Sequence, residues 1–130
     1  NTERYYWEFA RRVRDFRERA RALFGRLKSD GHRIAAYGAA AKGTILLNYL
    51  MLNEKVIEYV VDRNPHKHGK SVPGVNIRVC DPECLLHDSI EHVVILPWNF
   101  RDEIIRQQQE YLIGGGRFIV PIPNLEMVEA

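Results

Sequence analysis

The first thirty residues follow the hydrophobic pattern of one long amphipathic helix. Apolar residues recur at alternating steps of three and four, which places them along one face of a helix. This stripe consists of Tyr6, Phe9, Val13, Phe16, Ala20, Leu23 and Leu27. Gly31 follows Ser29 and Asp30 and supplies the left-handed conformation with which many helices end. The stripe predicts packing on its own domain or a bridge to an upstream domain, and its heptad spacing leaves a coiled coil open.

Beyond this helix, short apolar runs alternate with helical segments. The expected strands are 34–37, 56–61, 76–79, 92–96 and 118–120, and the expected helices are 44–52, 82–86 and 100–112. Continuous apolar strands that alternate with helices are typical of a parallel sheet covered on both faces. We therefore predict an α/β fold, a Rossmann-like open parallel sheet of about five strands with helices on both faces, preceded by a long N-terminal amphipathic helix.

One domain accounts for the whole chain in this interpretation. Residues 1–29 form the leading helix and residues 33–124 form the α/β core. The 130 residues include 45% hydrophobic and 28% charged residues, as in an ordinary globular domain. No apolar run approaches the roughly 20 residues that span a bilayer, so we expect no membrane contact.

Charge is unevenly distributed along the chain, whose net charge is +2. Residues 1–28 contain eight Arg and one Lys against four acids, a net charge of +5 that leaves −3 for the rest. Such a basic segment can attract nucleic acid or an acidic partner. Because the Arg residues alternate with acids at spacings that permit pairing along a helix, we interpret it as a solvated face and expect no nucleic-acid partner.

Two cysteines, Cys80 and Cys84, are too few for a disulfide framework. Their C-x-x-x-C spacing provides two potential metal ligands, but a structural zinc site uses four ligands in two recognisable pairs. Asp81 and Pro82 should start a short helix that contains Cys84, with Asp81 as cap and Pro82 at the first helical position. We expect no metal in this chain, and two unpaired thiols fit a reducing cytoplasm.

Unusual residues collect after the predicted strands, where ligands bind in open parallel sheets. Segments 38–43, 62–65, 97–100 and 121–124 each follow one strand, so we expect them at a single edge. The first of these fits the dinucleotide fingerprint G-x-G-x-x-G, with Ala40 in place of the second glycine. In that fingerprint the first glycine makes the turn, the second admits a pyrophosphate, and the third lets the helix pack on the strand.

Other residues of this edge are suited to an anionic, ring-containing ligand. The helix start would offer free N–H groups to an anion, and Lys42 would add a positive charge. Asp62 lies 19 residues after Gly43, about where an acid would bind a ribose. Trp98 is either buried or able to stack on a base or sugar, and Asn99 is a natural N-cap for the next helix. The candidate substrate-binding residues are Gly38, Ala39, Ala40, Lys42, Gly43, Asp62, Trp98 and Asn99.

Several ordered blocks resemble the C-terminal domain of S-adenosylmethionine-dependent sugar C-methyltransferases. They comprise residues 36–43, 46–48, 61–65, 73–74, 98–100, 103–105 and 115–123. The resemblance implies that a zinc-binding part and a domain that holds S-adenosylmethionine lie upstream and are absent here. It also implies that the parent protein methylates a nucleotide-linked ketosugar, and that this domain forms part of the sugar-nucleotide cleft beside the upstream methyltransferase domain. Zinc and S-adenosylmethionine would then be cofactors of the parent protein, with none in this fragment.

No catalytic residue stands out, because the chain contains no interpretable Ser/His/Asp arrangement or carboxylate pair. We therefore expect the isolated domain to be noncatalytic within an enzyme. Two alternatives stay open: a free-standing NAD(P)-binding domain, and a structural or dimerising module built on the leading helix. Ala40 and the lack of a catalytic group weigh against the first, whereas the basic helix keeps the second open.

Overall fold

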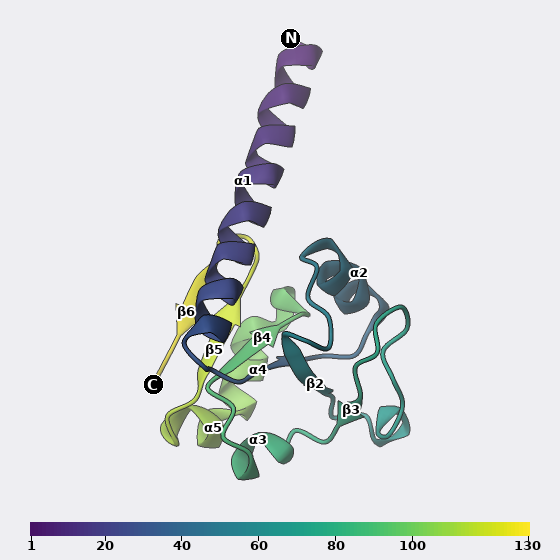
Figure 1. Ribbon diagram of the computed structural model, residues 1–130, viewed down its shortest axis with the longest axis vertical. Helices are drawn as coiled ribbons and strands as arrows, with labels where there is room; N and C mark the ends of the chain where they lie inside the picture. Colours follow the sequence, from purple (N-terminus) through teal and green to yellow (C-terminus); the bar gives the residue numbers. More distant parts are fainter.

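Six strands form a single sheet in the computed structural model, which describes residues 1–130 (Figure 1). They are β1 (Ile34–Tyr37), β2 (Ile57–Val61), β3 (Val79–Cys80), β4 (His92–Ile95), β5 (Arg117–Val120) and β6 (Glu126–Val128). Their order across the sheet is β3-β2-β1-β4-β5-β6. The first five are parallel, as predicted, and β6 adds an antiparallel edge strand that the sequence analysis missed.

Strand β1 lies at the centre of the sheet, where the strand order reverses. Ala36 of β1 lies opposite Val60 of β2 on one side and Val94 of β4 on the other. The chain completes β2 and β3 on one side of β1 and then crosses to β4 and β5. In open α/β sheets, such a switch point opens a crevice at the carboxyl ends of the strands.

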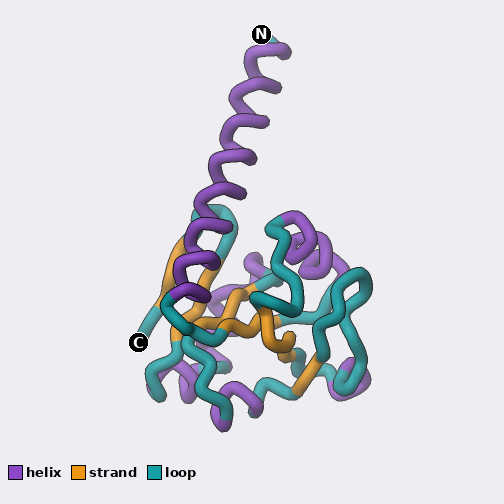
Figure 2. Tube along the Cα trace, viewed as in Figure 1, coloured by secondary structure: helices purple, strands orange, loops and turns teal.

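Helices cover both faces of the sheet, which confirms the predicted fold class (Figures 1 and 2). They are α1 (Thr2–Ser29), α2 (Ala41–Tyr49), α3 (Cys84–His87), α4 (Arg101–Gln107) and α5 (Gln109–Ile113). Side chains of β1 alternate between the two layers. Ile34 and Ala36 belong to the buried cluster with α1 and α2, whereas Ala35 and Tyr37 belong to the cluster with α3, α4 and α5.

All three helices predicted in the core differ in their bounds, and β3 is Val79–Cys80 in place of the predicted 76–79. The segment 100–112 is divided into α4 and α5 at Gln108, whose ψ of 30° leaves the helical region. Helix α3 begins at Cys84, later than predicted: Oδ1 of Asp81 accepts from the Glu83 N–H (2.8 Å), but Pro82 and Glu83 form a turn before the helix. Helix α2 starts at Ala41, so the second half of the glycine loop is the first turn of the helix.

Helix α1 is covered only along its C-terminal half. Ala20, Phe24 and Leu27 are buried against the sheet, whereas Tyr6 and Phe9 of the predicted stripe are exposed. The N-terminal half extends away from the rest of the chain (Figures 1 and 2). Gly31 follows the helix with φ of +81°, as its position predicted. None of the helices is both long and apolar enough to cross a membrane.

A histidine pair occupies the amino end of the sheet. His92 of β4 is completely buried, and its Nε2 lies 2.9 Å from Nδ1 of His32, in the connection between α1 and β1. The two rings stack with centroids 5.1 Å apart, while Nδ1 of His92 has no hydrogen-bond partner. Burial, together with His32 and Arg117, lowers the pKa of His92 below its ordinary value.

Candidate functional site

The turn after β1 requires a glycine at position 38 for two reasons. Gly38 has φ of +100°, a conformation that residues with side chains rarely adopt. A Cβ atom on Gly38 would also lie 2.5 Å from Cδ of Pro97, two residues after the end of β4. The Gly38 N–H donates to the Val61 carbonyl (2.8 Å), which ties the turn to β2. The first glycine of the fingerprint is thus fixed by backbone geometry.

Gly43 allows helix α2 to pack closely on the sheet. A Cβ atom at this position would lie 3.0 Å from the Gly38 carbonyl oxygen and 3.0 Å from the Leu96 side chain. This is the role that the fingerprint assigns to the third glycine. Ala40 stands at the second glycine position as the residue before α2, and its side chain is exposed.

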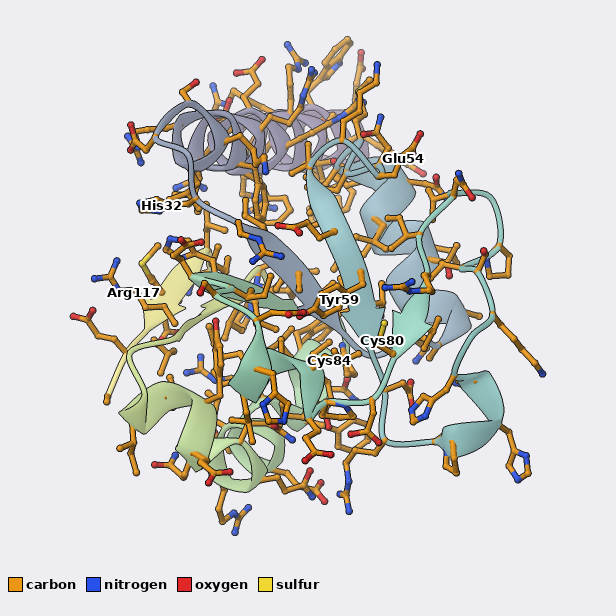
Figure 3. All side chains as sticks on the ribbon, turned by 60° about the horizontal axis from the view of Figure 1, so that its bottom comes forward. His32, Glu54, Tyr59, Cys80, Cys84 and Arg117 are labelled. Atoms are coloured by element: carbon orange, nitrogen blue, oxygen red, sulfur yellow. The ribbon has the colours of Figure 1, made fainter.

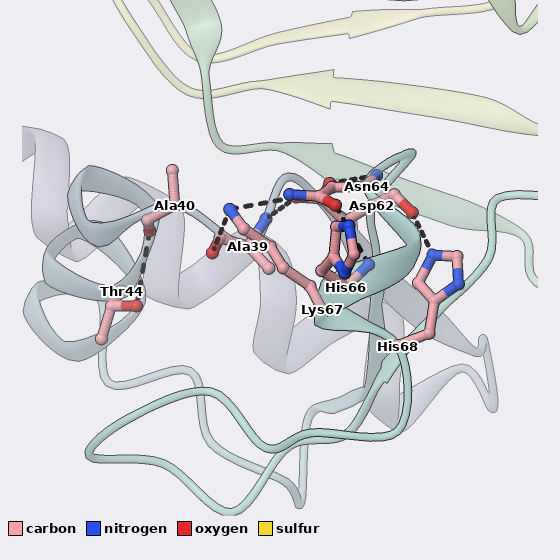
Figure 4. A network of polar contacts seen from close by, with 8 residues as sticks. All are labelled: Ala39, Ala40, Thr44, Asp62, Asn64, His66, Lys67 and His68. Carbon is pink, nitrogen blue, oxygen red and sulfur yellow. Dashed lines mark hydrogen bonds and ion pairs between the residues drawn. The ribbon is translucent and has the colours of Figure 1, made fainter.

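On the β2 side, the turn is held by a network of internal hydrogen bonds (Figure 4). Oδ2 of Asp62 accepts from the Ala39 N–H, and Oδ1 accepts from the Asn64 N–H, each at 2.8 Å. The Lys67 ammonium donates to the Ala39 carbonyl (3.2 Å) and lies 3.8 Å from Oδ2 of Asp62. His68 Nε2 lies 2.6 Å from the Asp62 carbonyl oxygen, which fixes the end of β2 to the same loop.

The internal hydrogen bonds of this network occupy the carboxylate and the backbone N–H group that a bound dinucleotide would need. Asp62 is only 16% exposed, and both of its carboxylate oxygens already accept hydrogen bonds from the backbone. The Ala39 N–H, which lies at the turn where a pyrophosphate would approach, is bonded to Asp62 as well. Asp62 and Ala39 therefore act as supports of the turn in this structure, with their hydrogen-bonding groups directed toward the protein.

On the β4 side, the turn opens onto a pocket of about 510 Å³ at the carboxyl ends of β1 and β4. Six of the eight candidate residues line it, namely Gly38, Ala40, Lys42, Gly43, Trp98 and Asn99. The Trp98 side chain is 38% exposed, and the side chains of Lys42 and Asn99 are exposed and form no hydrogen bond or ion pair within the chain. The structure thus brings these six together and leaves Ala39 and Asp62 on the other side of the turn.

Asn99 is not a helix cap, in contrast to the expectation from its position. Residues Trp98–Phe100 form a 3-10 turn, and α4 starts at Arg101 without a side-chain capping bond. Because the 3-10 turn leads directly into α4, the Asn99 side chain does not accept hydrogen bonds from the first N–H groups of the helix. Its amide is left facing the pocket.

Much of the pocket wall is apolar, and its residues on α2 lie outside the four segments that were expected at this edge. Eight of its thirteen lining residues are hydrophobic, including Ile45 and Phe100, which are 68% and 55% exposed. Tyr49 and Ile122 complete this wall from α2 and from the segment after β5. The strand ends were a usable signal for Phe100 and Ile122, whereas nothing in the spacing of Ile45 marks it.

Comparison with known proteins identifies the family. A family model for the C-methyltransferase C-terminal domain matches residues 1–123. The chain belongs to this family. C-methyltransferase NovU of Streptomyces niveus is 38% identical to it over 125 residues, which cover 96% of this chain and 30% of the relative. This C-methyltransferase C-terminal domain therefore spans less than a third of the length of that relative.

A solved structure supports the fold of this C-methyltransferase C-terminal domain. UDP-D-quinovosamine 4-dehydrogenase from Vibrio fischeri superposes with a TM-score of 0.53, at 18% sequence identity. The superposition covers 75% of this chain and 93% of the other. At this level of identity the likeness supports the Rossmann-like fold alone.

The two cysteines of this C-methyltransferase C-terminal domain are free and half-buried (Figure 3). Both pack against the buried cluster that contains Tyr59. Burial, followed by the neighbouring Cys80, raises the pKa of the Cys84 thiol, which disfavours the thiolate form. The structure groups no three His, Cys, Asp or Glu side chains in a position to hold a metal ion.

Proposed function

We propose that this C-methyltransferase C-terminal domain forms a noncatalytic wall of the substrate cleft in an S-adenosylmethionine-dependent enzyme that methylates a nucleotide-linked ketosugar. One observation carries the proposal. The pocket on the β4 side gathers a helix start, an exposed lysine, an exposed tryptophan and an exposed asparagine amide, none of whose polar side chains is used within the chain.

The chemistry of this pocket matches the parts of a nucleoside diphosphate-sugar. The first-turn N–H groups of α2 have no side-chain cap, and together with Lys42 they attract a diphosphate. Trp98 and Phe100 present aromatic surface on which a base or sugar ring can lie. The Asn99 amide can both donate to and accept from a sugar hydroxyl.

The proposal assigns binding, and not proton transfer, to this domain. Methylation beside a keto group needs a general base that forms an enolate, and a methyl sulfonium that the enolate attacks. No carboxylate or histidine lines the pocket. Its one phenol, Tyr49, donates a hydrogen bond to the Val13 carbonyl (3.2 Å). The base and the methyl donor would therefore belong to the upstream part of the enzyme.

Neither S-adenosylmethionine nor NAD fits the residues of this domain. In Rossmann-like proteins, an acid after the second strand binds the ribose of such ligands. Asp62 occupies that position but is directed toward Ala39, Asn64 and Lys67. The NAD alternative predicts that the isolated domain binds NADH and that Asp62→Ala lowers the affinity.

Calorimetry on the intact methyltransferase tests the proposal with uridine and thymidine diphosphate-sugars as probes. Lys42→Ala should weaken their binding several-fold, since a partly exposed charge contact contributes roughly 1 kcal/mol. Lys55→Ala, an exposed lysine outside the pocket, is the matched control and should leave the affinity unchanged. The 130-residue chain alone should show no saturable binding of S-adenosylmethionine or NADH. Saturable NADH binding, with sugar-nucleotide affinity indifferent to Lys42→Ala, would contradict the proposal.

A further inference from the structure

The N-terminal half of α1 carries aromatic side chains that no part of the chain covers. Tyr5, Tyr6 and Phe9 are 64%, 69% and 50% exposed, and the first buried residue of the helix is Ala20. By helical spacing, Tyr5 and Phe9 lie on the same face as the buried Ala20 and Leu27. One continuous apolar face is therefore covered by the sheet in its lower half and uncovered in its upper half.

This uncovered face forms one wall of an open groove of about 720 Å³, which we call the α1 groove. Helix α2 and residues 122–124 form the other wall. Its lining is formed by Tyr5, Phe9, Arg12, Val13, Asp15, Phe16, Arg19, Leu46, Tyr49, Ile122, Pro123 and Asn124. Tyr49 joins the two walls, since its hydroxyl donates to the Val13 carbonyl and its ring lies 5.4 Å from the Arg17 guanidinium.

The α1 groove lies next to the candidate substrate pocket. Leu46, Tyr49 and Ile122 line both hollows. An occupant of the groove would therefore contact three residues that also line the pocket. Soluble monomeric proteins rarely expose a large contiguous apolar face, and such a face marks an interaction site.

We propose that the α1 groove is the docking surface for the part of the same methyltransferase that holds the methyl donor; this rests on the proposed function. Two observations favour this occupant. The family is that of a C-terminal domain, and the similar C-methyltransferase is more than three times as long, since this chain covers 30% of it. Residues 1–28 carry a net charge of +5, so the matching surface has an apolar centre and an acidic rim.

Docking at this place also meets a requirement of the reaction. Methyl transfer needs the donor carbon and the acceptor carbon within roughly 3–3.5 Å of each other before reaction. A donor-holding domain seated in the α1 groove lies beside the pocket and helps to exclude water from it. The groove thereby positions the methyl donor, while Lys42 and Trp98 hold the sugar nucleotide.

Hydrogen exchange tests the docking surface in the intact methyltransferase. In the 130-residue chain, residues 2–16 should exchange fast, because a helix without packing is marginal in water. In the intact enzyme the same residues should exchange at least about tenfold more slowly. Phe9→Asp should restore the fast exchange and lower methyl transfer about tenfold, as loss of a central apolar contact does, without changing the affinity for a uridine diphosphate-sugar.

Ile113→Asp is the matched control, since Ile113 is also an exposed apolar residue (76%, against 50% for Phe9) at the end of α5, outside the groove. It should change neither exchange nor transfer, and both variants should leave the thermal unfolding of the 130-residue chain unaltered. Equal exchange in the chain and the intact enzyme would overturn the proposal. So would self-association of the 130-residue chain in sedimentation that Phe9→Asp abolishes, because a second copy would then cover the stripe. Slow exchange without sugar-nucleotide binding would instead refute the proposed function and leave the docking surface standing.

Discussion

On its β2 side, the Gly38–Gly43 turn is bonded to Asp62 and Lys67, whereas its β4 side opens onto a pocket in which the side chains of Lys42 and Asn99 have no partner in the chain. The two sides carry the same kinds of groups: an acid or amide, a lysine and backbone N–H donors. On one side these groups satisfy each other, and on the other they remain available. Clustering of polar residues at a strand end therefore does not by itself indicate a ligand site, and the informative property is which groups have no internal partner.

The largest expected effect concerns the glycine that both sides share. Gly38→Ala should cost at least about 4 kcal/mol of unfolding free energy, because the new Cβ would clash with the Pro97 ring in addition to the unfavourable φ. Gly115→Ala is the matched control, since Gly115 has φ of +105° and open space around it. That variant should lose about 1–2 kcal/mol, the usual effect of the left-handed conformation alone. Urea unfolding measures both, and equal losses would show that the contact with Pro97 does not constrain the turn.

An intermediate effect should separate the two sides of the turn. Asp62→Ala should destabilise the domain by about 1–3 kcal/mol, because the Ala39 and Asn64 N–H groups and the Lys67 ammonium lose their acceptor. Asp102→Ala, which removes an acid that is 91% exposed, should change the stability little. Thermal unfolding of the two variants makes the comparison. If Asp62→Ala is as harmless as Asp102→Ala, the carboxylate is free for a ligand and the contrast between the two sides fails.

The smallest effect is expected on the β4 side. Lys42→Ala and Asn99→Ala should each change the unfolding free energy by no more than about 0.5 kcal/mol, as surface substitutions usually do. Both side chains are exposed and unpaired, so their removal breaks no internal contact. Chemical denaturation of the 130-residue chain gives the values. A loss comparable to that of Asp62→Ala would mean that these groups support the fold, as those on the β2 side do.

The central sheet could be predicted because its signal is local. Strands β1, β2, β4 and β5 each contain at least three consecutive buried apolar residues, which is typical of strands covered on both faces. Strand β6 was missed because Glu126 and Met127 are exposed at the edge and show no apolar run. The break between α4 and α5 was missed because Gln108 gives no glycine or proline signal at that point.

The candidate site could be predicted in part, for a similar reason. The roles of Gly38 and Gly43 could be predicted from the sequence. The backbone conformation at Gly38 and the close packing at Gly43 each require a glycine. The internal hydrogen bonding of Asp62 could not be predicted from the sequence, since it depends on where the Lys67 ammonium and the Ala39 N–H lie in three dimensions. The α2 part of the apolar wall was missed because an exposed Ile45 in a helix has the same sequence pattern whether or not it borders a pocket.

The buried histidine at the amino end of the sheet makes folding of this domain dependent on proton concentration. The folded state keeps His92 neutral, with a pKa below its ordinary value of 6.5, mainly through burial and also through His32 and Arg117, with Glu91 opposing. As the pH falls below about 6.5, the unfolded chain takes up a proton at this position that the folded chain resists. The unfolding free energy should therefore decrease down to the lower pKa of folded His92 and be independent of this group above about 6.5.

Urea unfolding at about pH 7.5 and about pH 5.5 would reveal this loss, which should be smaller in His92→Gln than in the wild-type chain. An identical loss in both proteins would assign the acid sensitivity to other groups. The pocket at the opposite end contains no histidine or carboxylate. Mild acid should thus loosen the connection between α1 and β1, where His32 lies, while the charges that line the candidate pocket stay the same.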